Sequence, residues 1–149
     1  MRKGRELFRE NASRLHYPHF CALMAEAYCA LGATEEGVAV CDDGIAEAER
    51  TGGAYYEPEV LRLKGELLRM TAPSAAETYF RQAMATARRQ NAKSTELRAA
   101  ISLSRSLERT AARELLAPIY EWFKEGFDTA DLLEARDGLR PPLAGSTTR

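Results

Sequence analysis

Small side chains recur in this sequence at an interval of 40 and then 39 residues. This repeat restricts the possible folds more than any other feature of the sequence. Each small residue is followed three positions later by a larger one, giving the pairs Ala25 and Tyr28, Gly65 and Leu68, and Ser104 and Leu107. Residues three apart lie on one face of a helix, so the small one lets a second helix approach while the larger one fills the space beside it. The repeat therefore predicts helical hairpins.

The second helix of each predicted hairpin repeats as well. The matching positions are Gly37, Cys41 and Gly44, then Ala76, Phe80 and Ala83, and then Ala112, Leu116 and Ile119. This order of small and large residues is typical of tetratricopeptide repeats, whose usual period is about 34 residues. One hairpin cannot bury its apolar side alone, so hairpins stack. We predict an all-α fold, a tetratricopeptide-like α-α superhelix of about three helix pairs plus a C-terminal helix, with an irregular helical bundle as the alternative.

The helix boundaries follow from proline, glycine and capping residues, because the stretches between them are rich in helix formers and show no strand-like alternation. Thr34 and the capping box Ser74–Glu77 each predict a helix start. The expected helices cover 5–15, 18–31, 34–50, 58–68, 74–91, a stretch from 94 or 95, 111–124 and 129–137. The predicted turn of the third pair, residues 108–110, is about four residues shorter than that of the first pair. We expect an N-terminal helix (1–16), a repeat domain (17–137) and a disordered tail (138–149).

Composition excludes several classes of protein. With 149 residues and 45% hydrophobic content, the chain is expected to form one globular domain. A formal net charge of −1 provides no long-range field for nucleic acid or an anionic membrane, and no apolar run approaches the length of a membrane span. An odd number of cysteines, three, and the absence of a secretory signal favour a reducing, cytoplasmic setting.

Four segments of the chain resemble a known family. They are residues 22–53, the EVLRLKGELL stretch at 59–68, residues 80–103, and residues 115–135, which contain LLAPIYEWFKEGFDT. Together they are similar to the C-terminal tetratricopeptide region of bacterial signalling proteins, in which a nucleotide cyclase or a winged-helix regulator is joined to an ATPase. The resemblance implies a regulatory repeat region without catalysis of its own. Consistent with this, the chain has no GxxxxGK[ST] phosphate loop, and we expect neither enzymatic activity nor a cofactor.

The first helices of a tetratricopeptide solenoid line its inner surface, so the repeat register predicts a partner-binding groove. Its charged or titratable positions are His19, Glu26, Glu59, Arg62, Glu66, Arg69, Arg98, Arg105 and Arg109. The third pair carries only cations among these, which would suit an extended peptide with acidic groups held by forked arginine hydrogen bonds. The alternative is that these side chains only form the solvated faces of helices.

Three further clusters have structural interpretations. His16 and His19 lie near the three cysteines, but without a CxxC pair we favour buried thiols over a metal site. The acids Glu121, Glu125, Asp128 and Asp131 are interpreted as a solvated face. The aromatic residues Tyr120, Trp122, Phe123 and Phe127 are interpreted as a cap on the C-terminal core, with an exposed docking patch as the alternative.

These patterns favour a non-enzymatic interaction module that binds a protein or peptide, or a neighbouring domain of a larger signalling protein, without nucleic acid or membrane. The alternative is a small-molecule sensor domain of a transcriptional regulator, which would need a pocket with apolar walls. The exposed apolar end of a short solenoid also makes a homodimer plausible.

Overall fold

The computed structural model describes residues 16–51 and 54–140, and within these ranges the chain is all-helical. Seven α-helices and one short 3-10 helix account for the regular structure described, and these ranges contain no strand. The elements are α2 (Tyr17–Leu31), α3 (Thr34–Thr51), η2 (Ala54–Tyr56), α4 (Glu57–Leu68), α5 (Pro73–Arg89), α6 (Lys93–Ser104), α7 (Arg109–Tyr120) and α8 (Ala130–Leu139). The predicted all-α class is confirmed.

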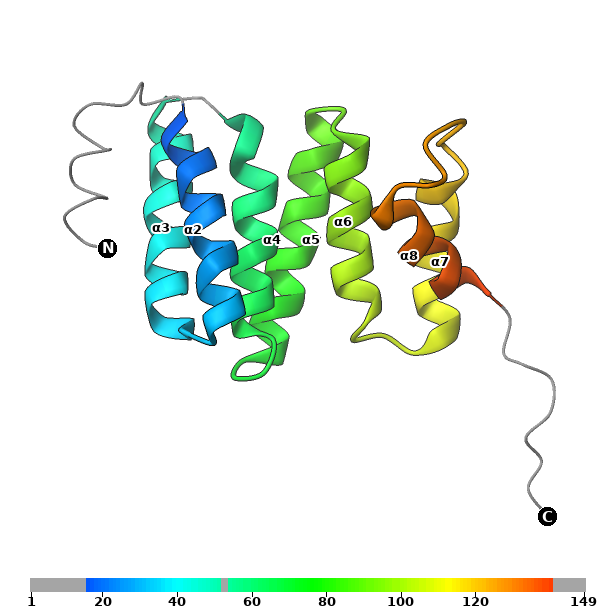
Figure 1. Cartoon of the computed structure of the whole chain (residues 1–149), viewed down its shortest axis with the longest axis horizontal. Coiled ribbons are helices and arrows are strands. Elements are labelled where there is room, and N and C mark those ends of the chain that lie inside the picture. The colour runs from blue at the N-terminus through cyan, green and yellow to red at the C-terminus, as the bar shows by residue number, and fades with distance from the viewer. Residues whose placement is uncertain (1–15, 52–53, 141–149) are drawn as a thin grey trace, which may run out of the picture.

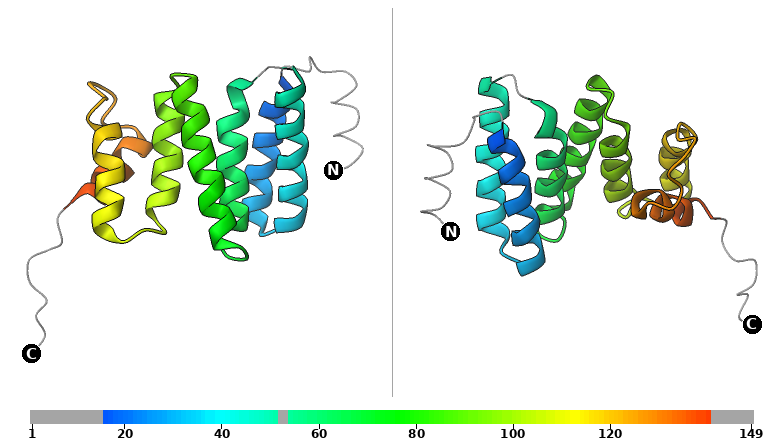
Figure 2. Two further views of the ribbon diagram at one scale, coloured as in Figure 1. Left: turned by 180° about the vertical axis from the view of Figure 1, so that it is seen from behind. Right: turned by 45° about the horizontal axis from the view of Figure 1, so that its top comes forward.

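The helices form two layers (Figure 1). Helices α2, α4, α6 and α8 lie on the face turned to the viewer, and the reverse view brings α3, α5 and α7 forward (Figure 2). Each helix packs against the next along the chain, and α2 also packs against α4, α4 against α6, and α6 against α8. We call the surface formed by α2, α4, α6 and α8 the first-helix face, because it collects the first helix of each hairpin together with α8.

Glycines allow the close approach of α2 and α3. A Cβ atom on Gly44 would lie 2.8 Å from the Cβ of Cys21, and one on Gly37 would lie 2.6 Å from a methyl group of Leu67 and 3.1 Å from the Cβ of Tyr28. Cβ atoms are essentially never found within 3.0 Å of other atoms, so a side chain on Gly44 would force Cys21 to shift, whereas at Gly37 the end of the Leu67 side chain of α4 would have to move. The small residues of the predicted second helix therefore lie at helix contacts, as the repeat required.

In the second hairpin a glycine also allows a close helix contact, but here it lies in the first helix of the pair, α4. A Cβ atom on Gly65 of α4 would lie 2.5 Å from the Phe80 ring of α5, which is fully buried. The matching residues of the first hairpin, Ala25 and Cys41, are fully buried in one apolar cluster. Gly65, like Gly37 and Gly44, thus lies at a close helix contact.

The third hairpin follows the register less closely. Ser104 is the last residue of α6 and is only half-buried, and its hydroxyl donates to the Ile101 carbonyl at 2.8 Å. Ser104 and Leu116, the pair that corresponds to Gly65 and Phe80, line a hollow of about 500 Å³ between α6, α7 and α8. The close contact expected at Ser104 is therefore replaced by open space.

Several boundaries differ from those expected. Helix α7 begins at Arg109 and ends at Tyr120, because residues 105–108 form the turn and residues 121–129 lie outside any helix. The predicted capping box is wrong, because α5 begins at Pro73 and its N-cap Ala72 makes no side-chain bond. Gly138 and Leu139 belong to α8, not to a tail. The expected N-terminal helix, apart from His16, and residues 141–149 of the expected tail lie outside the described residues.

None of the helices in the described ranges combines the length and the apolar composition that crossing a bilayer requires.

Candidate functional site

Eight of the nine predicted groove residues lie on the first-helix face. His19 and Glu26 come from α2, Glu59, Arg62 and Glu66 from α4, and Arg98 from α6, while Arg69 and Arg105 directly follow α4 and α6. On α4 the spacing 59, 62, 66, 69 follows one stripe of the helix, while the residues between them are mostly buried. Arg109 is the exception, because it begins α7 and belongs to the second helix of its pair. Its placement on the first helix of the pair was wrong, because α7 begins two residues before the expected start at residue 111.

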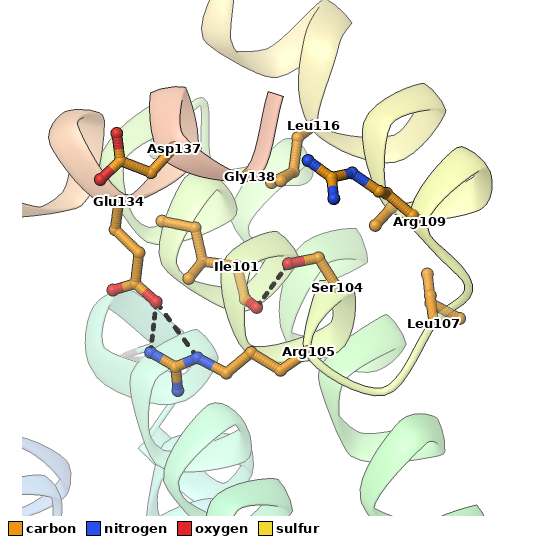
Figure 3. A pocket seen from close by; sticks show the side chains of 10 residues that line it. Ile101, Ser104, Arg105, Leu107, Arg109, Leu116, Glu134, Asp137 and Gly138 are labelled. Atoms are coloured by element: carbon orange, nitrogen blue, oxygen red, sulfur yellow. Dashed lines mark hydrogen bonds and ion pairs between the residues drawn. The ribbon is translucent and has the colours of Figure 1, made fainter. Parts of the chain in front are cut away.

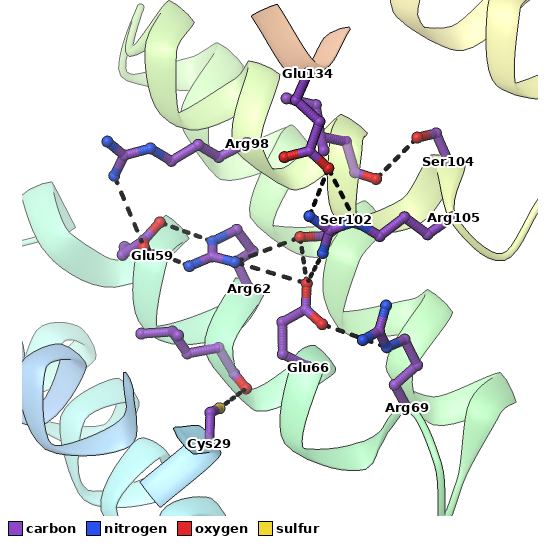
Figure 4. A network of polar contacts seen from close by, with 12 residues as sticks. Cys29, Glu59, Arg62, Glu66, Arg69, Arg98, Ser102, Ser104, Arg105 and Glu134 are labelled. Carbon is purple, nitrogen blue, oxygen red and sulfur yellow. Dashed lines mark hydrogen bonds and ion pairs between the residues drawn. The ribbon is translucent and has the colours of Figure 1, made fainter. Parts of the chain in front are cut away.

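Arg62 is held in place by two helices (Figure 4). Its guanidinium donates to both carboxylate oxygens of Glu59, at 3.0 and 2.7 Å, and to the hydroxyl of Ser102 on α6 at 3.4 Å. Burial disfavours the charged guanidinium, but the hydrogen bonds and charge of Glu59 and the charge of Glu66 outweigh it, so the pKa of Arg62 is above its ordinary value. A bidentate pair of this kind fixes the arginine's geometry.

Glu66 is the centre of the network drawn in Figure 4. One of its oxygens accepts from the Ser102 hydroxyl at 2.7 Å and from Arg105 at 3.2 Å. Arg62 lies 3.7 Å and Arg69 3.4 Å from the same carboxylate. Ser102 is only 1% exposed, so the network links α4 to α6 through a buried side chain as well as through side chains at the surface.

Helix α8 supplies two carboxylates that complete this network. Arg98 donates from Nε to Asp131 at 2.8 Å, and Arg105 donates to Glu134 at 2.6 Å. The hydrogen bond to Asp131 raises the pKa of Arg98 above its ordinary value, against the opposing effect of burial. The solvated-face interpretation was therefore wrong for Asp131, while Glu121, Glu125 and Asp128 are exposed.

The network is balanced in charge. Four carboxylates (Glu59, Glu66, Asp131 and Glu134) face four guanidinium groups (Arg62, Arg69, Arg98 and Arg105). The cationic surface expected for the third pair is thus neutralised by α8. Glu134 was missed in the sequence, although its spacing of three from Asp131 places both acids on one face of a helix.

The α2 end of the first-helix face carries aromatic side chains. The rings of His19 and Tyr56 lie 4.3 Å apart between centroids, and Tyr55 meets Tyr56 edge-on at 5.1 Å. Tyr55 and Leu23 are 75% and 53% exposed, although both are large and apolar in part. These residues surround a hollow of about 220 Å³ that continues along the face toward the ion-pair network. The two tyrosines were not singled out in the sequence, where they follow a glycine pair in a loop.

A second hollow lies between α6, α7 and α8 (Figure 3). It measures about 500 Å³ and is lined by apolar side chains such as Ile101, Leu107 and Leu116, with Arg105 and Glu134 at one side. Arg109 also lines it and donates to the backbone carbonyl of Arg140 at 2.8 Å, which links the start of α7 to the end of α8.

The two histidines and three cysteines of the predicted cluster lie in the part of the chain that the structure describes. No group of three or more His, Cys, Asp or Glu residues there could hold a metal ion. Cys21 and Cys41 are buried, and burial raises the pKa of the Cys41 thiol to about 12, which keeps it protonated.

The aromatic patch near the C-terminus is divided between core and surface. Tyr120 and Phe123 pack on the core, as the cap interpretation predicted, whereas Trp122 and Phe127 are 56% and 42% exposed.

Comparison with known proteins does not place the chain in a family. No family model matches it, and no curated protein or solved structure is significantly similar to it.

Proposed function

We propose that this protein is a non-enzymatic, tetratricopeptide-like interaction module, and that it serves as the regulatory repeat region of a bacterial signalling ATPase or cyclase in the cytoplasm. Its partner is a protein, a peptide or a neighbouring domain. The observation that carries the proposal is the first-helix face, which combines a hollow, exposed aromatic side chains and a prearranged ion-pair network across successive hairpins. The tetratricopeptide-like part is supported by the two-layer order and by the small-residue contacts of the first two pairs.

The ion-pair network stiffens this face in the proposed module. Its arginines are occupied by carboxylates of α4 and α8, so a partner gains little by competing for them. Binding energy then comes from the side chains that remain exposed beside the network, chiefly Leu23 and Tyr55. A rigid surface loses less conformational entropy when it binds.

Site-specific photo-crosslinking in the cell of origin tests the proposal. A benzoylphenylalanine replaces the exposed Leu23 on the first-helix face, and in a matched protein it replaces the exposed Ala39 on α3. We expect one reproducible crosslinked protein from position 23 and none from position 39. A second copy of this chain as the crosslinked product would identify a homodimer. Equal crosslinking from both positions, or crosslinking from position 39 alone, would contradict the proposal.

The hollow between α6, α7 and α8 supports a second candidate, a small-molecule sensor. Its volume of about 500 Å³ and its apolar lining fit a small organic ligand. A metabolite that binds there must raise the melting temperature of the protein. The Ala112→Phe substitution, which fills the hollow, should abolish that rise, and a rise that persists in this variant would place the ligand elsewhere.

A further inference from the structure

The hollow at the α2 end of the first-helix face has walls of mixed character. It is bounded by the rings of His19, Tyr55 and Tyr56, by the aliphatic Leu23, and by the carboxylates of Glu26 and Glu59. The three rings contact one another, because the ring of His19 packs against that of Tyr56 and Tyr55 meets Tyr56 edge-on. A hollow of about 220 Å³ accommodates one long side chain.

The carboxylate of Glu26 carries an uncompensated charge at this hollow. Among the residues that the structure describes, no cation lies within ion-pair distance of it. Its neighbours one turn away on α2 are Ala22, Leu23, Cys29 and Ala30, none of which is cationic.

The neighbouring charges of the hollow are already paired. Both carboxylate oxygens of Glu59 accept hydrogen bonds from Arg62, and Arg98 donates to Asp131 at 2.8 Å. Glu26 is therefore the negative charge that an incoming group would meet.

We propose that this hollow binds the side chain of a lysine or arginine from an extended segment of the partner protein. The aliphatic stem packs on Leu23 and the ring of Tyr55, and the cationic end meets Glu26. This inference rests on the proposed function and specifies the partner's chemistry. An acidic side chain would be repelled by Glu26, and a purely apolar one would bury that carboxylate without a partner.

The ion-pair network agrees with a basic ligand. Arg98 also lines the hollow, but Asp131 of α8 neutralises it, and Glu134 neutralises Arg105 beyond the hollow, so neither arginine presents an unpaired positive charge to the ligand. The partner segment expected here is thus basic at one position, which is opposite to the acidic peptide that the sequence pattern favoured.

Peptide titrations followed by 1H–15N NMR test the inference. The probe is the capped peptide Ac-Ala-Leu-Lys-Leu-Ala-NH2, compared with the same peptide carrying norleucine or glutamate in place of lysine. We expect the lysine peptide to bind about fivefold more tightly than the norleucine peptide, the size of effect given by one exposed ion pair with an aromatic contact. The glutamate peptide should bind most weakly, and the perturbed amides should cluster at residues 19–26 and 55–59.

Three variants identify the groups responsible. Glu26→Gln should remove the preference for lysine, because it weakens the lysine peptide and removes the charge that the norleucine peptide would otherwise bury. Tyr55→Ala should weaken both peptides, whereas Tyr55→Phe should weaken neither, because the ring is what contacts the stem. Glu36→Gln, the same charge change on an exposed residue of α3, is the matched control and should have no effect. These residues are exposed, so circular dichroism should show an unchanged fold.

The outcomes separate this inference from the proposed function. Equal binding of the lysine and norleucine peptides, tighter binding of the glutamate peptide, perturbed amides elsewhere, or an unchanged preference in Glu26→Gln would each overturn the inference. If crosslinking at position 23 succeeds in that case, the interaction module stands and only the chemistry of its ligand is wrong. If the lysine preference is found but no partner is crosslinked, the hollow binds cations and the proposed function fails.

Discussion

The first two hairpins and the third differ in how closely their paired helices pack. In the α2–α3 and α4–α5 pairs, glycines bring the helices into direct contact with buried side chains of the partner helix. In the α6–α7 pair, the corresponding residue is a serine at the last position of α6, and a hollow of about 500 Å³ remains. A small side chain brings two neighbouring helices into close contact only where both helices extend beyond that residue.

Helix α8 compensates for this looser packing. Leu132 and Ala135 are buried against the core, and Asp131 and Glu134 reach Arg98 and Arg105 of the α6 segment. The first two hairpins thus pack through glycine contacts, whereas the C-terminal region leaves a hollow and adds partly exposed ion pairs from α8. The predictions below test this contrast, from the largest effect to the smallest.

Filling a glycine contact should damage the tight region most. A Cβ on Gly65 would lie 2.5 Å from the Phe80 ring, which is fully buried and would have to shift. We expect Gly65→Val to lower the free energy of unfolding by about 3 kcal/mol, the upper part of the range for overpacked cores. Urea unfolding measures this, and a loss below about 1 kcal/mol would show that the contact is not tight.

Glu96 connects the two regions, and its removal should have the next largest effect. It is 2% exposed and accepts hydrogen bonds from Arg88 of α5 at 2.6 Å and from Lys93 of α6 at 2.8 Å. Burial acts to raise the pKa of Glu96, but these two cations outweigh it and lower the pKa below its usual value. We expect Glu96→Gln to lower the free energy of unfolding by about 2 kcal/mol at neutral pH.

The pH dependence of Glu96 follows from that lowered pKa. A carboxyl group whose pKa is depressed on folding stabilises the protein above its unfolded-state pKa, and that contribution is lost as the pH falls through the folded-state pKa. The stability difference between the wild type and Glu96→Gln should therefore shrink as the pH is lowered below about 4.5. Urea titrations at several pH values measure it, and a constant difference would contradict the ionised pairing.

Neutralising the α8 carboxylates should have a smaller effect. The Asp131 and Glu134 pairs are partly exposed, with side-chain exposures of 35% and 49%, and such pairs contribute little. We expect the double variant Asp131→Asn, Glu134→Gln to lose about 1 kcal/mol or less. Amide exchange should accelerate in α8 but stay unchanged in α2 and α3. Faster exchange across all helices would show that α8 is not a separate unit.

Enlarging Ser104 should have the smallest effect. The hollow beside it has room for additional methyl groups, so Ser104→Val should change stability by no more than about 0.5 kcal/mol. This variant is the counterpart of Gly65→Val at the equivalent repeat position. A loss as large as that of Gly65→Val would mean that the two regions pack alike.

The sequence predicted the helical class, and it placed Gly37, Gly44 and Gly65 at close helix contacts because small residues recur at these positions. It did not predict the start of α7, because residues 105–108 contain neither proline nor glycine to mark the turn. It placed most of the predicted groove residues on the first-helix face, since helical spacing alone determines which residues share one side of a helix. It could not show that Asp131 and Glu134 neutralise them, because the return of α8 onto α6 is a long-range contact.

Hydrogen exchange of the protein alone and bound to its crosslinked partner tests the central claim most directly. The account predicts that binding slows exchange in α2, η2 and α4 on the first-helix face, while α3 and α5 exchange as before. Protection confined to α3, α5 and α7 would show that the partner binds the opposite layer and would contradict the account.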